Sequence, residues 1–278
     1  MSSSYTPPAS IGLEGRVALV TGGANGMGEQ ASRTLASRGA SVVILDPDAE
    51  NAQRVVDAIS ADQGHAEFLP TDVTDENAIR EALDAVVRKH GRIDILDNNA
   101  AVLSLTRGDG TILDTPYSQF MDSLRANLGG PFLMSKHVVP IMLSNGGGSI
   151  INIASLSGML GELNLTAYGV TKAGVLQLTR AIATQFGGRG IRCNAIAPSY
   201  VTTPNNKNYS PQEVADIYQR HTPTSTLVSP QDIAEVVAFL ASDAARQING
   251  HIIPVDGGLT AASSVTADFR EFLNQQAG

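Results

Sequence analysis

The sequence predicts a single α/β domain in which helices flank a mainly parallel, doubly wound sheet of seven strands. Two observations predict this fold. Short apolar runs rich in Val, Ile and Leu alternate with helical patterns along most of the 278 residues. A glycine-rich turn also joins the first apolar run to a helical pattern, as in proteins that bind phosphate at a helix N-terminus. The chain is long enough to bury one large core, and no repeat or long low-complexity linker divides it.

Seven runs have the length and composition of buried strands. They span residues 16–21, 41–46, 66–70, 93–98, 148–154, 190–196 and 251–255. Open α/β sheets bind ligands beyond the carboxyl ends of their strands, so the loops that follow these runs are where a site is expected. The Ser/Pro-rich residues 1–10 are predicted to be a mobile arm, 11–259 the single folded domain and 260–278 a C-terminal tail.

The glycine-rich turn follows the first strand and reads Gly22-Gly23-Ala24-Asn25-Gly26-Met27-Gly28. Glycines allow a phosphate to approach the backbone closely, and the free N–H groups and dipole of the following helix favour an anion. The spacing G-x-x-x-G-x-G differs from the common dinucleotide pattern G-x-G-x-x-G, and glycine composition alone is also compatible with a flexible surface loop.

Asp46 ends the second predicted strand, 46 − 26 = 20 residues after Gly26. An acidic residue at this interval binds the adenosine ribose hydroxyls of NAD and repels the 2′-phosphate of NADP. Neither Pro47 nor Asp48 is basic, and neither is Asn25, so the sequence favours NAD over NADP. The alternative is a polar residue that merely ends a strand.

Tyr168 and Lys172 lie four residues apart in a helical pattern and therefore share one helix face. A free phenol has a pKa of about 10, so it becomes a useful general acid and base when a nearby positive charge stabilises the phenolate. Lys172 can supply that charge. Taken alone, the pair is also compatible with a partly buried ring beside a solvated ammonium.

Together these residues resemble the classical short-chain dehydrogenase/reductase family, over about Leu13 to Leu259. The segments that carry the resemblance are Thr21-Gly22-Gly23-Ala24-Asn25-Gly26-Met27-Gly28, Asp72-Val73, Asn98-Asn99-Ala100, Asn127, Ser155, Tyr168 with Lys172, Pro198 with Thr203, and Val255-Asp256-Gly257-Gly258. The resemblance implies a Rossmann-type domain that binds NAD(P), with a substrate lid over residues 199–228. It also implies an enzyme that interconverts a secondary alcohol and a ketone by hydride transfer.

The resemblance also assigns the catalytic roles. Tyr168 would exchange the proton with the substrate oxygen, and Lys172 would lower the pKa of Tyr168 and bind the nicotinamide ribose. Ser155 would hold the substrate oxygen, while Asn127 would position a water that links Lys172 to solvent. The nicotinamide itself carries the hydride chemistry.

The same resemblance implies a set of contacts along the cofactor. These contacts are Gly22, Asn25, Gly26, Met27, Gly28, Asp46, Asp72, Val73, Asn99, Ala100, Tyr168, Lys172, Pro198, Val201 and Thr203. Asp72 and Val73 would lie at the adenine, and Thr203 near the nicotinamide carboxamide. A competing interpretation makes Asp72 a helix or turn cap and Asn98-Asn99 an ordinary turn.

Three residues depart from the family pattern. Ala101 and Ser199 stand where glycine is usual, so the shape of the nicotinamide and substrate pocket is in doubt, and either would be strained if its φ were positive. Asp97 places a carboxyl group in a predicted central strand, and the sequence gives no account of it.

Charge and cysteine content exclude several classes of protein. A net charge of −8 without a basic run argues against nucleic-acid binding. No apolar run reaches the length of a membrane span or forms a signal core, which makes a cytoplasmic location the default. Cys193 is the only cysteine and is predicted to be a buried, inert thiol. The five histidines lack metal-ligand spacing, so no metal is expected.

Substrate and assembly are less constrained. The segment after Ser199 is polar and contains a predicted helix over 211–218. The expected pocket residues are mostly apolar and favour a neutral alcohol or ketone: Ser157, Met159, Leu160, Leu163 and Tyr200. A 3-oxoacyl-carrier-protein reductase and a catalytically silent dinucleotide-binding protein remain alternatives. The resemblance suggests a homotetramer or homodimer.

Overall fold

The computed structural model describes residues 11–203 and 211–277; the predicted arm at 1–10, part of the predicted lid at 204–210 and Gly278 lie outside the described residues. The described residues form a seven-stranded sheet in the order β3-β2-β1-β4-β5-β6-β7, and every strand pair is parallel. The strands are β1 (Val17–Thr21), β2 (Ser41–Asp46), β3 (His65–Pro70), β4 (Ile95–Asn98), β5 (Gly148–Ile153), β6 (Ile191–Pro198) and β7 (Ile252–Val255). The predicted doubly wound fold is confirmed.

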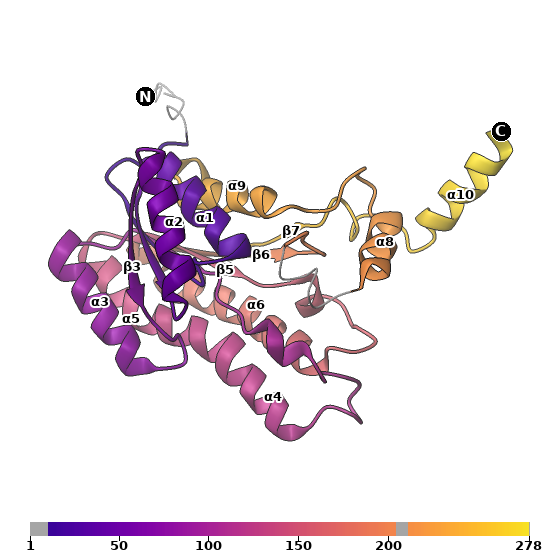
Figure 1. Cartoon of the computed structure of the whole chain (residues 1–278), viewed down its shortest axis with the longest axis horizontal. Coiled ribbons are helices and arrows are strands. Elements are labelled where there is room, and N and C mark those ends of the chain that lie inside the picture. The colour runs from indigo at the N-terminus through magenta and orange to yellow at the C-terminus, as the bar shows by residue number, and fades with distance from the viewer. Residues whose placement is uncertain (1–10, 204–210, 278) are drawn as a thin grey trace.

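Helices cover both faces of this sheet (Figure 1). One face packs against α1 (Gly26–Ser37), α2 (Ala49–Ala61) and α9 (Pro230–Ala241). The other packs against α3 (Glu76–His90), α5 (Gly130–Ser144) and α6 (Thr166–Phe186). The remaining α-helices of the described chain are α4 (Tyr117–Leu124), α8 (Gln212–His221) and α10 (Thr266–Ala277).

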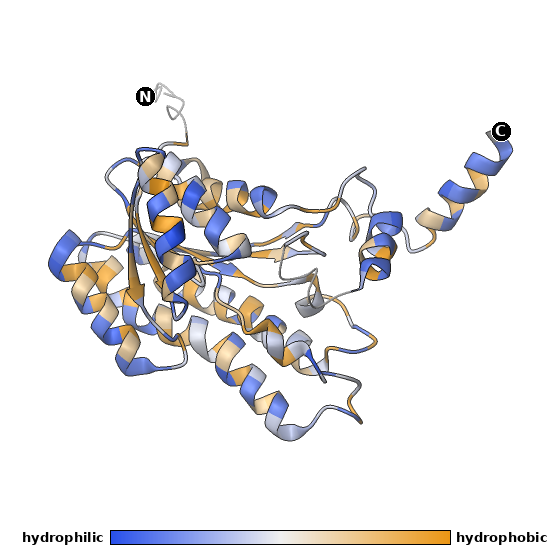
Figure 2. Cartoon of the chain, viewed as in Figure 1, coloured by the Kyte–Doolittle hydropathy of each residue, from blue (hydrophilic) through white to orange (hydrophobic). Residues whose placement is uncertain are grey.

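Two apolar cores, one on each face, hold these layers together. In β1, Val17 and Leu19 belong to one core while Ala18 and Val20 belong to the other, because successive strand residues point to opposite faces. Strands buried on both faces are apolar at nearly every position, which explains why the sequence shows them as continuous apolar runs. The strands are orange along most of their length in Figure 2.

The ends of the predicted elements differ from the observed ones by a few residues. The predicted strand 93–98 begins at Ile95, because Ile93 and Asp94 precede the paired segment. The sixth strand extends to Pro198, two residues beyond its predicted end, and the helix predicted at 211–218 is α8, which continues to His221. Cys193 is buried in β6, and burial raises the pKa of its thiol to about 12, as expected of an inert cysteine.

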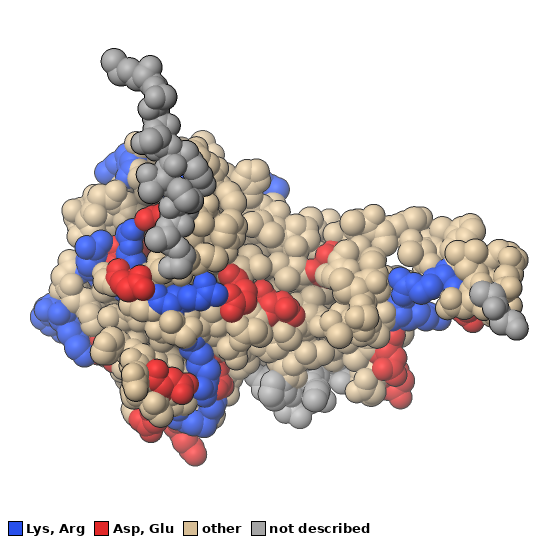
Figure 3. Space-filling model, turned by 90° about the horizontal axis from the view of Figure 1, so that it is seen from above, with Lys and Arg blue, Asp and Glu red and all other residues tan. Residues whose placement is uncertain are grey.

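The outer surface mixes charges of both signs. On the face shown in Figure 3, Lys and Arg lie beside Asp and Glu. In the described part of the chain no helix is both long and apolar enough to cross a bilayer. Helix α10 stands away from the sheet in Figure 1, and its Phe269, Phe272 and Leu273 side chains are each more than half exposed.

Asp97 is a buried carboxyl group without a partner. It pairs in register with Val20 and Ile151, so its side chain lies on the face of the sheet where those two residues pack in the apolar core. The Asp97 side chain has no exposed surface, and neither carboxyl oxygen has a hydrogen-bond partner among the described residues. Burial raises its pKa from 3.8 to about 8, because the charged form is poorly solvated there.

Asp97 should make the protein less stable as the pH rises. Between about pH 4 and pH 8 the unfolded chain loses the Asp97 proton while the folded chain keeps it, so unfolding becomes more favourable. Across this window the loss is on the order of 5 kcal/mol. We therefore expect Asp97→Val to raise the melting temperature more at pH 8 than at pH 5.

Asp94 supplies the matched control for thermal denaturation across that range. It is also buried, but Arg92 and the Val17 N–H bond its carboxylate and hold its pKa below the usual value. Asp94→Asn should therefore lower the melting temperature, and lower it more at pH 8 than at acidic pH. An Asp97→Val variant that melts below the wild type at pH 8 would contradict this account.

Candidate active site

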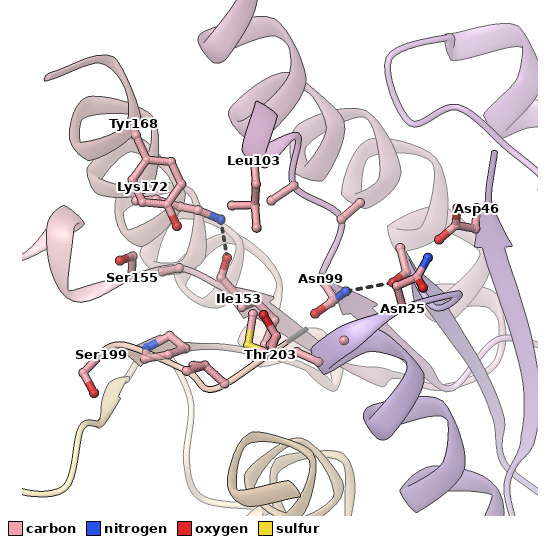
Figure 4. Close-up of a pocket in the computed structure, with 18 residues that line it drawn as sticks. Asn25, Asp46, Asn99, Leu103, Ile153, Ser155, Tyr168, Lys172, Ser199 and Thr203 are labelled. Carbon is pink, nitrogen blue, oxygen red and sulfur yellow. Dashed lines mark hydrogen bonds between the residues drawn. The ribbon is translucent and has the colours of Figure 1, made fainter. Parts of the chain in front are cut away.

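A pocket of about 270 Å³ opens at the carboxyl ends of the central strands, where β1 lies beside β4 and the strand order reverses. Figure 4 shows Tyr168, Lys172 and Ser155 at one end of it and Asp46 and Asn25 at the other. Its walls consist of Gly22, Asn25, Gly26, Met27, Asp46, Asn99, Ala100, Ala101, Leu103, Ile153, Ala154, Ser155, Tyr168, Lys172, Pro198, Ser199, Val201 and Thr203.

The glycine turn forms the floor of the pocket and requires its glycines. Gly22 has φ of +66°, and a Cβ there would lie 2.9 Å from the Ala100 Cα. A Cβ on Gly28 would lie 2.1 Å from the Gly22 carbonyl oxygen, closer than atoms can approach. Helix α1 begins at Gly26, and its first backbone N–H groups are therefore available to an anion in the pocket.

Asp46 lines the pocket at the end opposite Tyr168. Its Oδ2 accepts a hydrogen bond from the Ala24 N–H at 3.1 Å, and its Oδ1 accepts one from the Asp48 N–H at 2.9 Å. The carboxyl group is 7 % exposed, and burial raises its pKa above the usual value while the two backbone donors oppose that effect. Because each carboxylate oxygen can accept more than one hydrogen bond, Asp46 can still receive ribose hydroxyls.

The turn after β4 is tied to β1 by the Thr21 hydroxyl. This oxygen accepts hydrogen bonds from the backbone N–H groups of Asn99 and Ala100 and donates to the Asp97 carbonyl. The Asn99 amide donates to the carbonyl oxygens of Thr21 and Gly22. Asn99 therefore supports the glycine turn, whereas Asn98 points into the core and bonds Asn152 and Ser135.

The proton-transfer candidates come from α6 and the end of β5. Lys172 is 2 % exposed; its Nζ donates to the Ile153 carbonyl at 2.8 Å and lies 5.7 Å from the centre of the Tyr168 ring. Ser155 follows β5 and presents its hydroxyl beside Tyr168 (Figure 4). One helix and one strand end therefore supply the phenol, the ammonium and the hydroxyl.

Burial dominates the proton affinities of this group. It raises the pKa of Tyr168, with a smaller opposing effect from the hydrogen bond to Ser155 and further raising by the nearby Tyr218 and Glu162. Burial lowers the pKa of Lys172 to about 8. Burial is therefore the largest effect on the Tyr168 pKa in this structure, and the predicted lowering of that pKa by Lys172 stays a prediction.

Asn127 lies in a single π-helical turn, η2 (Arg125–Gly129), between α4 and α5. Such turns often occur at functional sites because they redirect one side chain from a helix. The Asn127 Oδ1 accepts a hydrogen bond from the Val102 N–H at 2.8 Å, and its Nδ2 is buried without a partner in the described residues. Asn127 does not line the described pocket, but its unused donor suits the water-binding role predicted for it.

Three other predicted cofactor contacts lie outside the pocket walls described here. Asp72 is exposed and accepts hydrogen bonds from the N–H and hydroxyl of Thr74, as the turn-cap interpretation expects. Val73 packs toward α5, where a Cβ on Gly130 would meet it at 2.9 Å. Gly28 does not line the pocket and instead packs against the Gly22 carbonyl oxygen of the turn.

The two departures from glycine produce no backbone strain. Ala101 and Ser199 both line the pocket, but among the described non-glycine residues only Gln63 and Leu165 have positive φ. The replacements therefore change the shape of the pocket without straining its backbone. Leu103, Ile153 and Ala154 also line it and were not predicted, because apolar residues near a strand end resemble ordinary core.

Asp109 is a site residue that sequence reasoning missed. It is 4 % exposed, and its two carboxylate oxygens accept hydrogen bonds from the Ala167 and Tyr168 N–H groups at 2.9 and 2.8 Å. Leu165, which precedes α6, has φ of +64° and provides no side-chain cap. Asp109 therefore caps the catalytic helix from 59 residues before Tyr168 in sequence, a separation at which local spacing carries no signal.

A series of hydrogen bonds links Ser155 to the exposed Glu162. The Ser155 hydroxyl bonds the Ser157 hydroxyl at 3.3 Å, and the Ser157 hydroxyl donates to Glu162 at 2.9 Å. Nearby, the rings of Tyr200 and Tyr218 pack at 5.4 Å between centres. Of the predicted substrate contacts, Met159, Leu160 and Leu163 are exposed and do not line the described pocket.

The fold and site define a dinucleotide-binding α/β protein with a tyrosine and lysine at the reacting end. A family model described as enoyl-(acyl carrier protein) reductase matches residues 22–260. The chain belongs to the short-chain dehydrogenase/reductase family, a family of oxidoreductases.

Several characterised relatives cover nearly the whole domain. The 7α-hydroxysteroid dehydrogenase of Bacteroides fragilis is 38 % identical over 89 % of this chain and 95 % of its own length. The meso-2,3-butanediol dehydrogenase of Serratia marcescens is 39 % identical over 90 % of this chain and 96 % of its own. A solved 7α-hydroxysteroid dehydrogenase in complex with NADH and 7-oxo glycochenodeoxycholic acid is 36 % identical, with a TM-score of 0.84 over 89 % of this chain and 95 % of its own.

Removing the Asp109 cap should destabilise the protein. Asp109→Ala leaves two buried N–H groups at the start of α6 unbonded, so we expect the free energy of unfolding to fall by about 1–3 kcal/mol in urea denaturation. Asp114→Ala, an exposed carboxyl group in the same loop, is the matched control and should change it by less than about 0.5 kcal/mol. If the two variants lose the same free energy of unfolding, Asp109 does not stabilise α6 as a cap.

Proposed function

We propose that this protein is an NAD-dependent dehydrogenase that interconverts a neutral secondary alcohol and its ketone. The observation that carries the proposal is the pocket itself: Tyr168, Lys172 and Ser155 stand at one end, and the glycine turn and Asp46 at the other. This arrangement fits a dinucleotide laid across the switch point of the sheet, with its reactive ring beside Tyr168. The relatives named above are dehydrogenases of hydroxyl-bearing molecules, which agrees with it.

The donor set of the pocket fits NAD. The first backbone N–H groups of α1 face the pocket and would bind the pyrophosphate, and the Asp46 carboxylate would receive the adenosine ribose. Pro198, Val201 and Thr203 also line the pocket and would lie beside the nicotinamide. When bound, the nicotinamide would supply hydride transfer, and the protein would supply position and proton traffic.

Each catalytic side chain has one task in this proposal. Ser155 holds the substrate oxygen, and Tyr168 gives a proton to that oxygen in ketone reduction or takes it in alcohol oxidation. Lys172 binds the nicotinamide ribose with the N–H groups it does not use on Ile153. The free Nδ2 of Asn127 would hold a water on the route from Lys172 to solvent.

The raised pKa of Tyr168 makes the proton-transfer step depend on pH. At neutral pH the phenol is protonated and suited to donate in ketone reduction, whereas oxidation requires the phenolate. We infer that alcohol oxidation is faster at alkaline pH. The exposed Glu162 carboxylate at the open side would disfavour an anionic substrate, so a neutral one fits best.

Two alternatives remain, and both predict different behaviour. A 3-oxoacyl-carrier-protein reductase would reduce the 3-keto group of 3-oxoacyl thioesters and not simple ketones. A catalytically silent binder would take up NADH without turnover, but the intact set of Asn127, Ser155, Tyr168 and Lys172 disfavours it. A cytoplasmic location and a homotetramer or homodimer complete the proposal.

Replacing Tyr168 by Phe should nearly eliminate turnover, because the hydroxyl that carries the proton is lost. Turnover is measured with a panel of secondary alcohols and ketones, in the presence of NAD or NADH. The absorbance of the reduced nicotinamide reports the rate. NADH binding should be retained, since the ring remains. Tyr117→Phe, which removes the hydroxyl of an exposed tyrosine on α4, is the matched control. Turnover that survives in Tyr168→Phe would remove Tyr168 from the mechanism, and an inactive wild type that still binds NADH would favour the silent binder.

The projecting helix α10 offers a test of assembly. If its exposed apolar face lies against a second copy, a chain ending at Leu259 should sediment as a smaller species than the full chain. A variant with Phe269, Phe272 and Leu273 changed to Ser should behave in the same way. Unchanged sedimentation of both would make the tail dispensable for assembly.

A further inference from the structure

A charged cluster lies beside the adenosine end of the pocket, between α1 and α2. Glu29 is its centre: the Arg54 guanidinium makes two hydrogen bonds to its carboxylate, at 2.9 and 2.7 Å. Arg33, one turn further along α1, bonds the same carboxylate at 3.1 Å. The Glu29 carboxylate therefore accepts hydrogen bonds from two arginines.

Arg54 also contacts the glycine turn. The Arg54 Nη2 donates to the Ala24 carbonyl oxygen at 3.3 Å, and the backbone N–H of Ala24 donates to the Asp46 carboxylate. Only one residue thus separates the Arg54 guanidinium from the carboxylate expected to bind the adenosine ribose. A cation at this distance is where a ribose 2′-phosphate would be recognised.

The Arg54 guanidinium is already occupied by Glu29. A guanidinium binds a phosphate best through two parallel N–H groups, and here both terminal nitrogens are engaged by the Glu29 carboxylate. The hydrogen bonds from Arg54 lower the pKa of Glu29, so the pair stays ionised at neutral pH. An incoming 2′-phosphate would have to displace Glu29 as well as approach Asp46 and Asp48.

We propose that Glu29 is a second determinant of NAD selectivity, which acts by engaging Arg54 so that this arginine is withheld from the 2′-phosphate of NADP. Asp46 excludes the phosphate by direct repulsion, and Glu29 removes the cation that would otherwise attract it. Glu29 is a positioning residue, since it acts through Arg54 and does not line the pocket described here. The inference rests on the proposed nicotinamide site and names what sets its choice of cofactor.

The test compares the dissociation constants of NADH and NADPH by calorimetry, which requires no turnover. In Asp46→Asn the direct repulsion is removed, and NADPH should bind more tightly than to the wild type. Adding Glu29→Gln should tighten NADPH by roughly tenfold more, as expected for a charge-assisted contact, while NADH changes little. Glu29→Ala, measured in the same background, should show at least the same gain.

Two arginine controls assign that gain to its source. Arg54→Met in the double variant should abolish the added NADPH affinity, whereas Arg33→Met should leave it, because only Arg54 contacts the glycine turn in the described structure. A gain that persists without Arg54, or an NADPH-to-NADH ratio unaffected by either Glu29 variant, would overturn the inference while the cofactor site stands. Failure of the wild type to bind either dinucleotide would overturn the proposed function together with it.

Discussion

The parallel pairing of β1 with β4 is the constraint on which the rest of the site depends. At this pair the strand order reverses, so the loops that leave the two strands diverge and leave a crevice between them. The Thr21 hydroxyl joins the two strand ends by accepting the Asn99 and Ala100 N–H groups. Because this brings the Ala100 backbone against the glycine turn, position 22 has no room for a side chain. The shape of the glycine turn and the register of the strand ends therefore follow from one contact region.

The sequence was sufficient for the parts of this design that local chemistry records. Strands buried on both faces appear as apolar runs, and a close backbone approach appears as glycine, so the sheet and the turn at Gly22 could both be predicted. Asp46 was found because a strand end and a fixed interval coincide there. Tyr168 and Lys172 were legible as one helix face.

What the sequence could not show depends on side chains brought together by the fold. Asp109 caps α6 from a distant loop, and no local pattern distinguishes it from other acidic loop residues. The spacing of Tyr168 and Lys172 reveals the neighbouring ammonium but not how much solvent the phenol loses, and burial is the largest effect on the Tyr168 pKa. Asp72 matches a family position and bonds Thr74 within its own turn in the described structure, so its contact with the adenine stays a prediction.

The two ends of the pocket handle charge in opposite ways. At the reacting end, Lys172 has no carboxylate partner in the described structure and burial sets its pKa near 8, so its charge is available to whatever group enters. Beside Asp46 at the other end, the charges of Glu29, Arg33 and Arg54 are already paired with one another. Unpaired charge suits a step in which protons move, because small changes in surroundings alter its ionisation. Paired charge suits discrimination, because it presents a fixed field that an additional phosphate must disrupt. The two ends of one pocket therefore differ in how much their charge can respond to a group that enters.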